Sequence, residues 1–193
     1  MAPPPLPRAF YARPTEQVAA DLLGKIIVRT CDNGSVQRAR IVEVEAYLGT
    51  RDRASHARNG PTSRSAIMFG PPGHLYVYLI YGMHHCMNFV CEADGIAGAV
   101  LIRAAEPLGD PDPVAMRGPG KLCRSLNVTL SHKGLDVTSP KAALYVVDDG
   151  VVLRVARSAR IGVDHAGAAA RRRLRFFVPH HPSVSGPVSL RRG

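Results

Sequence analysis

A β-hairpin pattern near the start of the chain places the strongest constraint on the fold. Residues 25–30, KIIVRT, and residues 36–47, VQRARIVEVEAY, are rich in β-branched side chains. The Asp32-Asn33-Gly34 segment between them is a strong turn signal. We therefore expect an antiparallel sheet to be built around this pair of strands.

The rest of the chain continues the antiparallel pattern with few helices. Short helices are expected over residues 15–24 and 121–126. Crossover helices do not alternate regularly with strands, which predicts an α+β fold and argues against a doubly wound nucleotide-binding sheet. The further expected strands are residues 75–81, residues 86–91 paired with 97–104, and residues 143–147 paired with 151–155.

A single domain accounts for the length of the chain. It has 193 residues, of which 46% are hydrophobic and 21% charged, and these are globular values. Residues 1–9 contain four prolines and are expected to form a flexible arm, so that residues 10–193 make up the domain. Residues 49–74 are polar and rich in Gly and Pro, and such a long loop inside a compact domain is usually functional.

The composition also bears on the compartment of the protein. The four cysteines show no CxxC spacing and are expected to be reduced thiols. The sequence contains no run of 18 apolar residues and no pattern of a secretory signal at its start. We therefore expect a cytoplasmic, nucleoid-associated protein in a bacterium or a nuclear protein in a eukaryote, with no membrane partner.

Positive charge is concentrated towards the C-terminal end. The net charge is +10, and residues 151–193 hold nine arginines against a single acidic residue, Asp164. A genome rich in G·C would also raise the arginine content, but it would not explain the shortage of acids. Neutralisation of nucleic-acid phosphates explains both.

The VEVEAY segment carries the clearest candidate chemistry. Strand periodicity places Glu43, Glu45 and Tyr47 on one face, while Val42, Val44 and Ala46 face the core. A carboxylate beside an aromatic ring, on a strand that leads into a long loop, suits a cleft. A solvated strand face fits the same spacing, and the tyrosines of residues 75–81 are equally consistent with ordinary core and edge positions.

Several familiar motifs are absent. Gly118-Pro119-Gly120-Lys121 ends like a phosphate-binding loop, but the first glycine and the final Ser or Thr of that motif are missing. The adjacent histidine pairs, His84-His85 and His180-His181, do not have the spacing of a zinc site even when the cysteines are included. We therefore expect no metal site.

Six blocks follow one another in this order: IVEVEAYLG, SHARNGPTSR, MFGPPGHLYVYLIYGMHHCMN, VLIRAAEP, GPGKLC and ARIGV. Together they span nearly the whole chain and closely resemble the 3-methyladenine (alkyladenine) DNA glycosylase family. The resemblance implies one domain around a curved antiparallel β-sheet with flanking short helices, and no metal or organic cofactor. It also implies an enzyme of base excision repair that flips alkylated or deaminated purines, such as 3-methyladenine and hypoxanthine, out of damaged double-stranded DNA.

The resemblance assigns the catalytic roles. Glu45 matches the base that activates water, and Arg103 matches the arginine that helps to hold that water. The backbone carbonyl of Ile161 matches a third water ligand. Glu43 also occupies a family position, but we expect it to pair with a nearby arginine and assign it no catalytic role.

The resemblance assigns the DNA contacts in the same way. Tyr47 and Tyr78 would cover the two faces of the flipped base and His56 its edge, while Asn88 would exclude the exocyclic amino group of guanine. Tyr81 would wedge into the duplex, with Met83 and His84 against the neighbouring bases. The candidates for phosphate contacts are Thr62, Arg64, Arg171, Arg172 and Arg173.

The sequence thus predicts a monomeric, monofunctional glycosylase. Lyase-capable relatives use a lysine nucleophile, and none of the four lysines lies in a pocket block. Two alternatives remain open at this level. One is a metal-dependent nuclease that uses Glu43, Glu45 and Asp52 around magnesium, and the other is a non-catalytic protein that binds duplex DNA.

Overall fold

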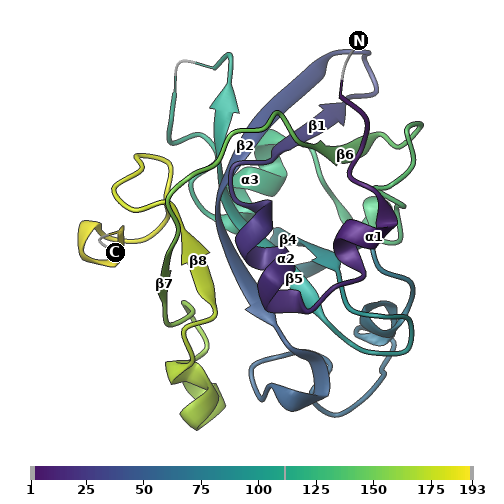
Figure 1. The fold of residues 1–193 in the computed structure, drawn as a ribbon, viewed down its shortest axis with the longest axis vertical. Coiled ribbons are helices and arrows are strands. Elements are labelled where there is room, and N and C mark those ends of the chain that lie inside the picture. Colours follow the sequence, from purple (N-terminus) through teal and green to yellow (C-terminus); the bar gives the residue numbers. More distant parts are fainter. Residues whose placement is uncertain (1–2, 111, 192–193) are drawn as a thin grey trace.

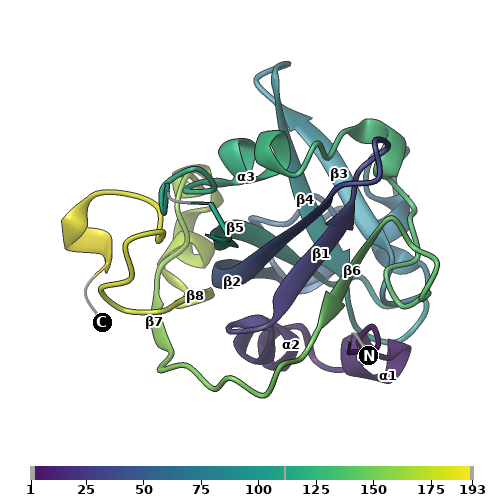
Figure 2. The ribbon, with the colours of Figure 1, turned by 90° about the horizontal axis from the view of Figure 1, so that it is seen from above.

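The fold is organised by one antiparallel sheet of eight strands, six of which follow the order β3-β4-β5-β2-β1-β6. The computed structural model describes residues 3–110 and 112–191. The sheet curls into a half-barrel, as the view from above shows (Figures 1 and 2). Its strands are β1 (Ile26–Thr30), β2 (Val36–Tyr47), β3 (Leu75–Ile80), β4 (His84–Val90), β5 (Ala99–Leu108), β6 (Leu144–Val147), β7 (Ala156–Ser158) and β8 (Arg175–Phe177).

The helices are short, and all three α-helices of the described residues contribute to the main core. Tyr11 of α1, Val18 and Leu22 of α2, and Leu122 and Cys123 of α3 belong to the same buried apolar cluster as the inner residues of the sheet. The α-helices are α1 (Arg8–Tyr11), α2 (Thr15–Leu22) and α3 (Pro119–Ser125), and the 3₁₀ turns are η1 (Gly49–Arg51), η2 (Ala66–Phe69), η3 (Leu130–His132), η4 (Asp164–Arg171) and η5 (Val188–Arg191). No helix among the described residues is both long and apolar enough to cross a bilayer.

The α+β prediction is confirmed, together with the first two hairpins. β1 pairs with β2, and β4 pairs with β5. The third expected hairpin is wrong, because β6 pairs with β1 and residues 151–155 form no strand. Two ion pairs hold this turn segment instead: Asp148 pairs with Lys25, which directly precedes β1, and Asp149 pairs with Arg40 of β2. The chain then rejoins the sheet at β7, which pairs with β8.

Part of the expected N-terminal arm is packed against the sheet. Pro5 forms a bridge to Val147, and the Leu6 N–H donates to the carbonyl of Val146 at 2.8 Å. The Leu6 side chain is only 7% exposed. From Pro5 onward the segment is therefore attached rather than loose, while Met1 and Ala2 lie outside the described residues.

A bulge in β2 changes which of its residues face the core. The register with β5 shifts on both sides of Glu43. Val44 and Ala46 belong to the main core, whereas Val42 packs with Phe177 and Val184 in a separate cluster. The strict alternation expected for this strand is therefore wrong at Val42, because a bulge inserts an extra residue into the ladder. The bulge brings β8 alongside β2, where it covers Glu43.

Candidate active site

Glu45 lies at the centre of a buried polar cluster near the end of β2. Its side chain is 0% exposed, so the alternative of a solvated strand face is wrong. Oε2 accepts a hydrogen bond from the Tyr47 hydroxyl at 2.8 Å, and Oε1 accepts one from the Ile161 N–H at 2.8 Å. Arg103 Nη1 lies 3.3 Å from Oε1. One carboxylate is thus oriented by a neighbour on its own strand and by two segments that are distant in sequence.

Glu43 forms a second, fully buried network beside Glu45. Its carboxylate accepts from Arg103 Nε at 3.0 Å, from Arg175 Nε at 2.7 Å and from the Ser185 N–H at 2.6 Å. Burial raises the pKa of Glu43, but Arg103 and Arg175 outweigh it, so that this pKa lies below its usual value. The expected pairing of Glu43 with an arginine is confirmed, and Arg103 connects the two carboxylates.

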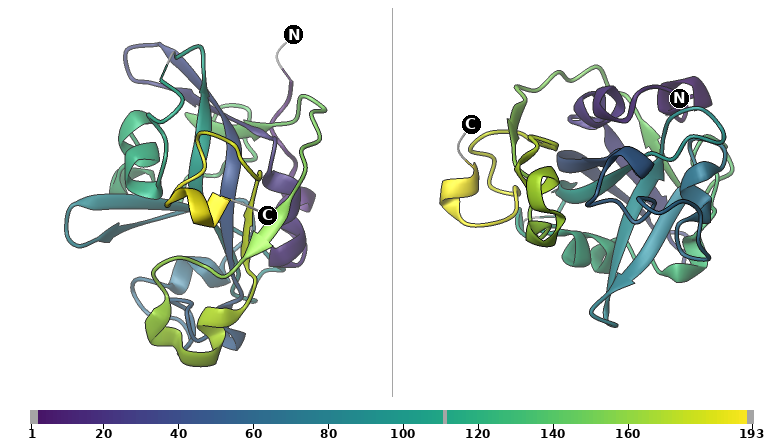
Figure 3. Two further views of the ribbon diagram at one scale, coloured as in Figure 1. Left: turned by 90° about the vertical axis from the view of Figure 1, so that its left-hand side faces the viewer. Right: turned by 90° about the horizontal axis from the view of Figure 1, so that it is seen from below.

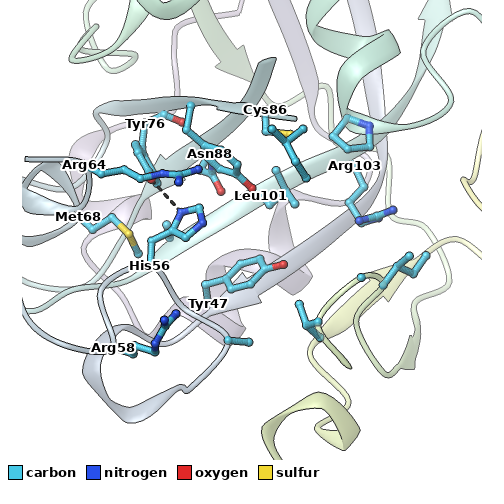
Figure 4. A pocket seen from close by; sticks show the side chains of 18 of the residues that line it. Tyr47, His56, Arg58, Arg64, Met68, Tyr76, Cys86, Asn88, Leu101 and Arg103 are labelled. Atoms are coloured by element: carbon cyan, nitrogen blue, oxygen red, sulfur yellow. Dashed lines mark hydrogen bonds between the residues drawn. The ribbon is translucent and has the colours of Figure 1, made fainter. Parts of the chain in front are cut away.

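A cavity of about 230 Å³ opens beside Glu45. Most of the site residues expected from the sequence line it, while Glu45 itself lies directly behind Tyr47, Arg103 and Ile161. In Figure 4 the Tyr47 ring lies across the cavity from Asn88. The expected residues among its lining are Tyr47, His56, Arg64, Tyr78, Tyr81, Asn88, Arg103 and Ile161.

Aromatic contacts fix one wall of the cavity. His56 Nδ1 lies 2.9 Å from the Tyr76 hydroxyl (Figure 4). The His56 ring also meets the Tyr78 ring edge to face, with the ring centroids 4.6 Å apart. Burial, with Arg64 and Arg58 nearby, lowers the pKa of His56 to about 4. At neutral pH the imidazole is therefore uncharged, and one of its ring nitrogens can accept a hydrogen bond.

Asn88 is held rigidly in the same wall. Its side chain is 3% exposed, and Nδ2 donates to the carbonyl of Tyr76 at 3.0 Å. Tyr47 lies across the cavity from Asn88 (Figure 4). Burial and the neighbouring Glu45 carboxylate raise the pKa of Tyr47 well above its usual value. Tyr47 therefore stays a neutral hydroxyl that donates to Glu45.

The hairpin between β3 and β4 projects from the body of the molecule, as two views show (Figures 2 and 3). At its tip, Tyr81 is 84% exposed and Met83 is 70% exposed. Tyr81 has a φ of +52°, which is uncommon for a residue with a side chain and costs on the order of 1–3 kcal/mol. Tyr81 lines the cavity beside Glu45, whereas Met83 and His84 line a separate hollow against α3.

The candidates for phosphate contacts occupy different surroundings. Arg64 stacks on the Tyr78 ring, with Cζ 5.0 Å from its centroid, and so belongs to the cavity rim. Thr62 bonds to Ser65 in an exposed loop, and neither it nor residues 171–173 line the cavity. Arg171, Arg172 and Arg173 are all exposed.

Sequence reasoning missed an ion pair behind the cavity. Arg160 and Asp52 are both nearly fully buried and bond to each other. Arg175 and Ser185, which bond to Glu43, were also missed. None of these residues lies near its partner in the sequence, and the only available signal was that Arg160 precedes Ile161 in the ARIGV block.

The carboxylates that a metal-dependent nuclease would use form ion pairs with arginines. Glu43 pairs with Arg103 and Arg175, and Asp52 pairs with Arg160. Within residues 3–110 and 112–191, no group of three or more His, Cys, Asp and Glu side chains is arranged to hold a metal ion. The donor set therefore does not fit a magnesium site.

Comparison with known proteins agrees with this geometry. A family model described as "Methylpurine-DNA glycosylase (MPG)" matches residues 9–182. Three relatives share the name "Putative 3-methyladenine DNA glycosylase". That of Methanocella arvoryzae is 48% identical over 194 residues, covering 94% of this chain and 96% of its own length. Those of Anaeromyxobacter dehalogenans strain 2CP-1 and Myxococcus xanthus are 52% and 46% identical, covering 94% and 97% of this chain and 86% and 97% of their own lengths. The chain belongs to the methylpurine-DNA glycosylase family.

Proposed function

We propose that this glycosylase flips an alkylated or deaminated purine, such as 3-methyladenine or hypoxanthine, out of duplex DNA and hydrolyses its N-glycosidic bond. The products are a free base and an abasic site. The observation that carries the proposal is a fully buried carboxylate, Glu45, directly behind an aromatic-lined cavity. A buried carboxylate is costly unless it is hydrogen-bonded, and such groups are characteristic of functional sites.

The chemistry follows from the position of Glu45. Its carboxylate takes a proton from a water molecule, whose oxygen then bonds to C1′ of the sugar. The bond between C1′ and the base nitrogen breaks, and its electron pair leaves with the base. The negative charge of Glu45 also stabilises the positive charge that develops on the sugar. In this scheme Arg103 and the Ile161 carbonyl help to hold the water.

The cavity supplies recognition of the base. Tyr47 and Tyr78 stack on its two faces, and aromatic faces favour an electron-poor or cationic alkylated purine. His56, neutral at physiological pH, contacts its edge. Asn88 is buried and bonded to the Tyr76 carbonyl, so it cannot swing aside for the amino group of guanine. None of the four lysines lines the cavity, which favours hydrolysis without a lysine nucleophile.

The exposed hairpin tip and the basic surface bind the DNA. Tyr81 fills the space left by the flipped nucleotide, and Met83 and His84 contact the adjacent bases. Thr62, Arg64 and residues 171–173 contact phosphates, which predicts binding that weakens steeply with salt. We expect the enzyme to act as a monomer. Because its substrate is chromosomal DNA, we expect it to work at the nucleoid of a bacterial cell, or in the nucleus if the source is a eukaryote.

The proposal is tested by Glu45→Gln. We expect excision of hypoxanthine from a duplex oligonucleotide to fall by at least roughly 10²–10⁴-fold, because the general base is lost, while binding to the lesion duplex persists. Glu106→Gln is the matched control, since Glu106 is 39% exposed and does not line the cavity. Excision by Glu45→Gln within tenfold of the wild-type rate would refute the assignment. Loss of activity in chelator would favour the nuclease instead.

A further inference from the structure

A buried arginine lies immediately behind the base cavity. Arg160 is 5% exposed and does not line the cavity, whereas Tyr47 and Ile161, which it adjoins, both do. Its guanidinium donates to both oxygens of Asp52, at 2.5 and 2.8 Å, and to the carbonyl of Ala46 at 2.8 Å. A two-point contact of this kind fixes the plane of the guanidinium as well as its position.

The fixed guanidinium packs against Tyr47. Arg160 Cζ lies 4.7 Å from the centroid of the Tyr47 ring, within the range of a cation–π contact. Because Tyr47 lines the cavity and Arg160 does not, the cation supports the ring from behind. The same ring carries the hydroxyl that donates to Glu45.

Arg160 also sets the peptide group that faces Glu45. The Ile161 N–H, which donates to Glu45 at 2.8 Å, belongs to the peptide bond that directly follows Arg160. Asp52 in turn accepts from the N–H groups of Leu48 and Ala54, at 3.2 and 3.1 Å. The Arg160–Asp52 pair therefore joins the end of β2, the loop after it and the segment that precedes η4.

We propose that Arg160, held by Asp52, is a positioning residue for base excision. It sets both the Tyr47 ring and the Ile161 amide, and these two groups supply two of the three donors that orient the Glu45 carboxylate. The inference rests on the function proposed above and extends it to a residue that touches neither base nor sugar. Loss of the two-point contact should therefore slow bond cleavage without weakening attachment to undamaged DNA.

The test compares Arg160→Met and Arg160→Lys with Arg40→Met. Arg40 makes the same two-point contact with Asp149, at 3.0 and 2.7 Å, on a strand face away from the cavity. Single-turnover excision of hypoxanthine is measured at pH 7, below the melting temperature of each variant. We expect Arg160→Met to excise at least tenfold more slowly than wild type and Arg40→Met to stay within twofold of it. The affinity for undamaged duplex should be unchanged in both.

The split between rate and affinity separates positioning from a general loss of structure. Because Arg160 contacts no DNA in this scheme, the single-turnover rate should fall while the affinity for undamaged duplex stays unchanged. A loss of duplex affinity in parallel with the rate would overturn the proposal, as would a rate within threefold of wild type. If Arg160→Met does not fold, the proposal is tested with Arg160→Lys, because lysine keeps the positive charge but cannot form the two-point contact. We expect it to be at least fivefold slower, and a wild-type rate would overturn the proposal. A wild-type protein that excises no faster than Glu45→Gln would refute the proposed function instead.

Discussion

The substitution Glu43→Gln tests whether the buried network beside Glu45 stabilises the fold or takes part in the reaction. The Glu43 side chain is 0% exposed and accepts from Arg103, from Arg175 and from both the N–H and the hydroxyl of Ser185. Glutamine preserves the shape of the side chain and removes its negative charge. The two positive guanidiniums then face a neutral amide, one half of which is a donor directed at other donors.

The magnitude follows from this burial. Removing one partner of a buried ion pair costs about 3–5 kcal/mol. For a chain of this length, each kcal/mol lowers the melting temperature by roughly 2–4 °C, so the expected fall is roughly 6–20 °C. Arg103 is 11% exposed and keeps a second carboxylate, Glu45, at 3.3 Å, which favours the lower half of this range.

The assay is thermal unfolding at pH 7, followed by circular dichroism, with Asp149→Asn as control. Asp149 pairs with Arg40 at the surface, where its side chain is 29% exposed, and such pairs contribute about 0–1 kcal/mol. Excision by the folded fraction of Glu43→Gln should fall less than tenfold, because Glu45 keeps its three donors. A melting temperature within 3 °C of that of the control would show that the network does not stabilise the fold.

Three further predictions concern the cavity and the hairpin. Tyr81→Ser should reduce the flipped fraction of an ethenoadenine lesion, read by its fluorescence, because the exposed ring fills the vacated space; an unchanged fraction would exclude Tyr81 as the wedge. Asn88→Ser should raise the ratio of guanine excision to hypoxanthine excision, since it removes the amide that is hydrogen-bonded to Tyr76 in the cavity wall. An unchanged ratio would show that other residues determine the selectivity. The pKa of His56 is lowered from 6.5 to about 4, so folding favours its neutral form. Its contribution to stability is complete above about pH 6.5 and is lost as the pH falls towards 4. His56→Gln should therefore flatten the fall in melting temperature over this range, and parallel curves for the two proteins would contradict the shift.

Local chemistry made the strands of the first hairpin predictable. The Asp32-Asn33-Gly34 segment specifies a tight turn whatever surrounds it, and β1 and β2 pair on either side of it. Asp148-Asp149-Gly150 carries the same kind of signal, yet it ends a strand without forming a hairpin. Its two carboxylates pair with Lys25, which directly precedes β1, and with Arg40 of β2, and no local sequence pattern reveals such partners.

The site residues that belong to a sequence motif were predictable, whereas those whose positions depend on tertiary packing were not. The VEVEAY block led to Glu45 and Tyr47, and the cavity contains most of the residues expected from the other blocks. The bulge at Glu43 depends on the registers of β5 and β8 with β2, which lie far along the chain. Alternation alone therefore placed Val42 in the wrong layer.

The arginines of the C-terminal part of the chain fall into a buried group and an exposed group. Arg160 and Arg175 are buried and paired with carboxylates of the acid-richer first part of the chain, so neither is available to phosphates. Residues 171–173 are exposed and remain candidates for DNA contact. Asp164 is the only acidic residue after residue 150, so the two buried arginines have few local carboxylates to pair with. They pair instead with Glu43 on β2 and with Asp52 in the loop after it. The pairs that attach this part of the chain also bring the Ile161 N–H to Glu45, so the carboxylate acquires its full set of donors only when the C-terminal segment has docked.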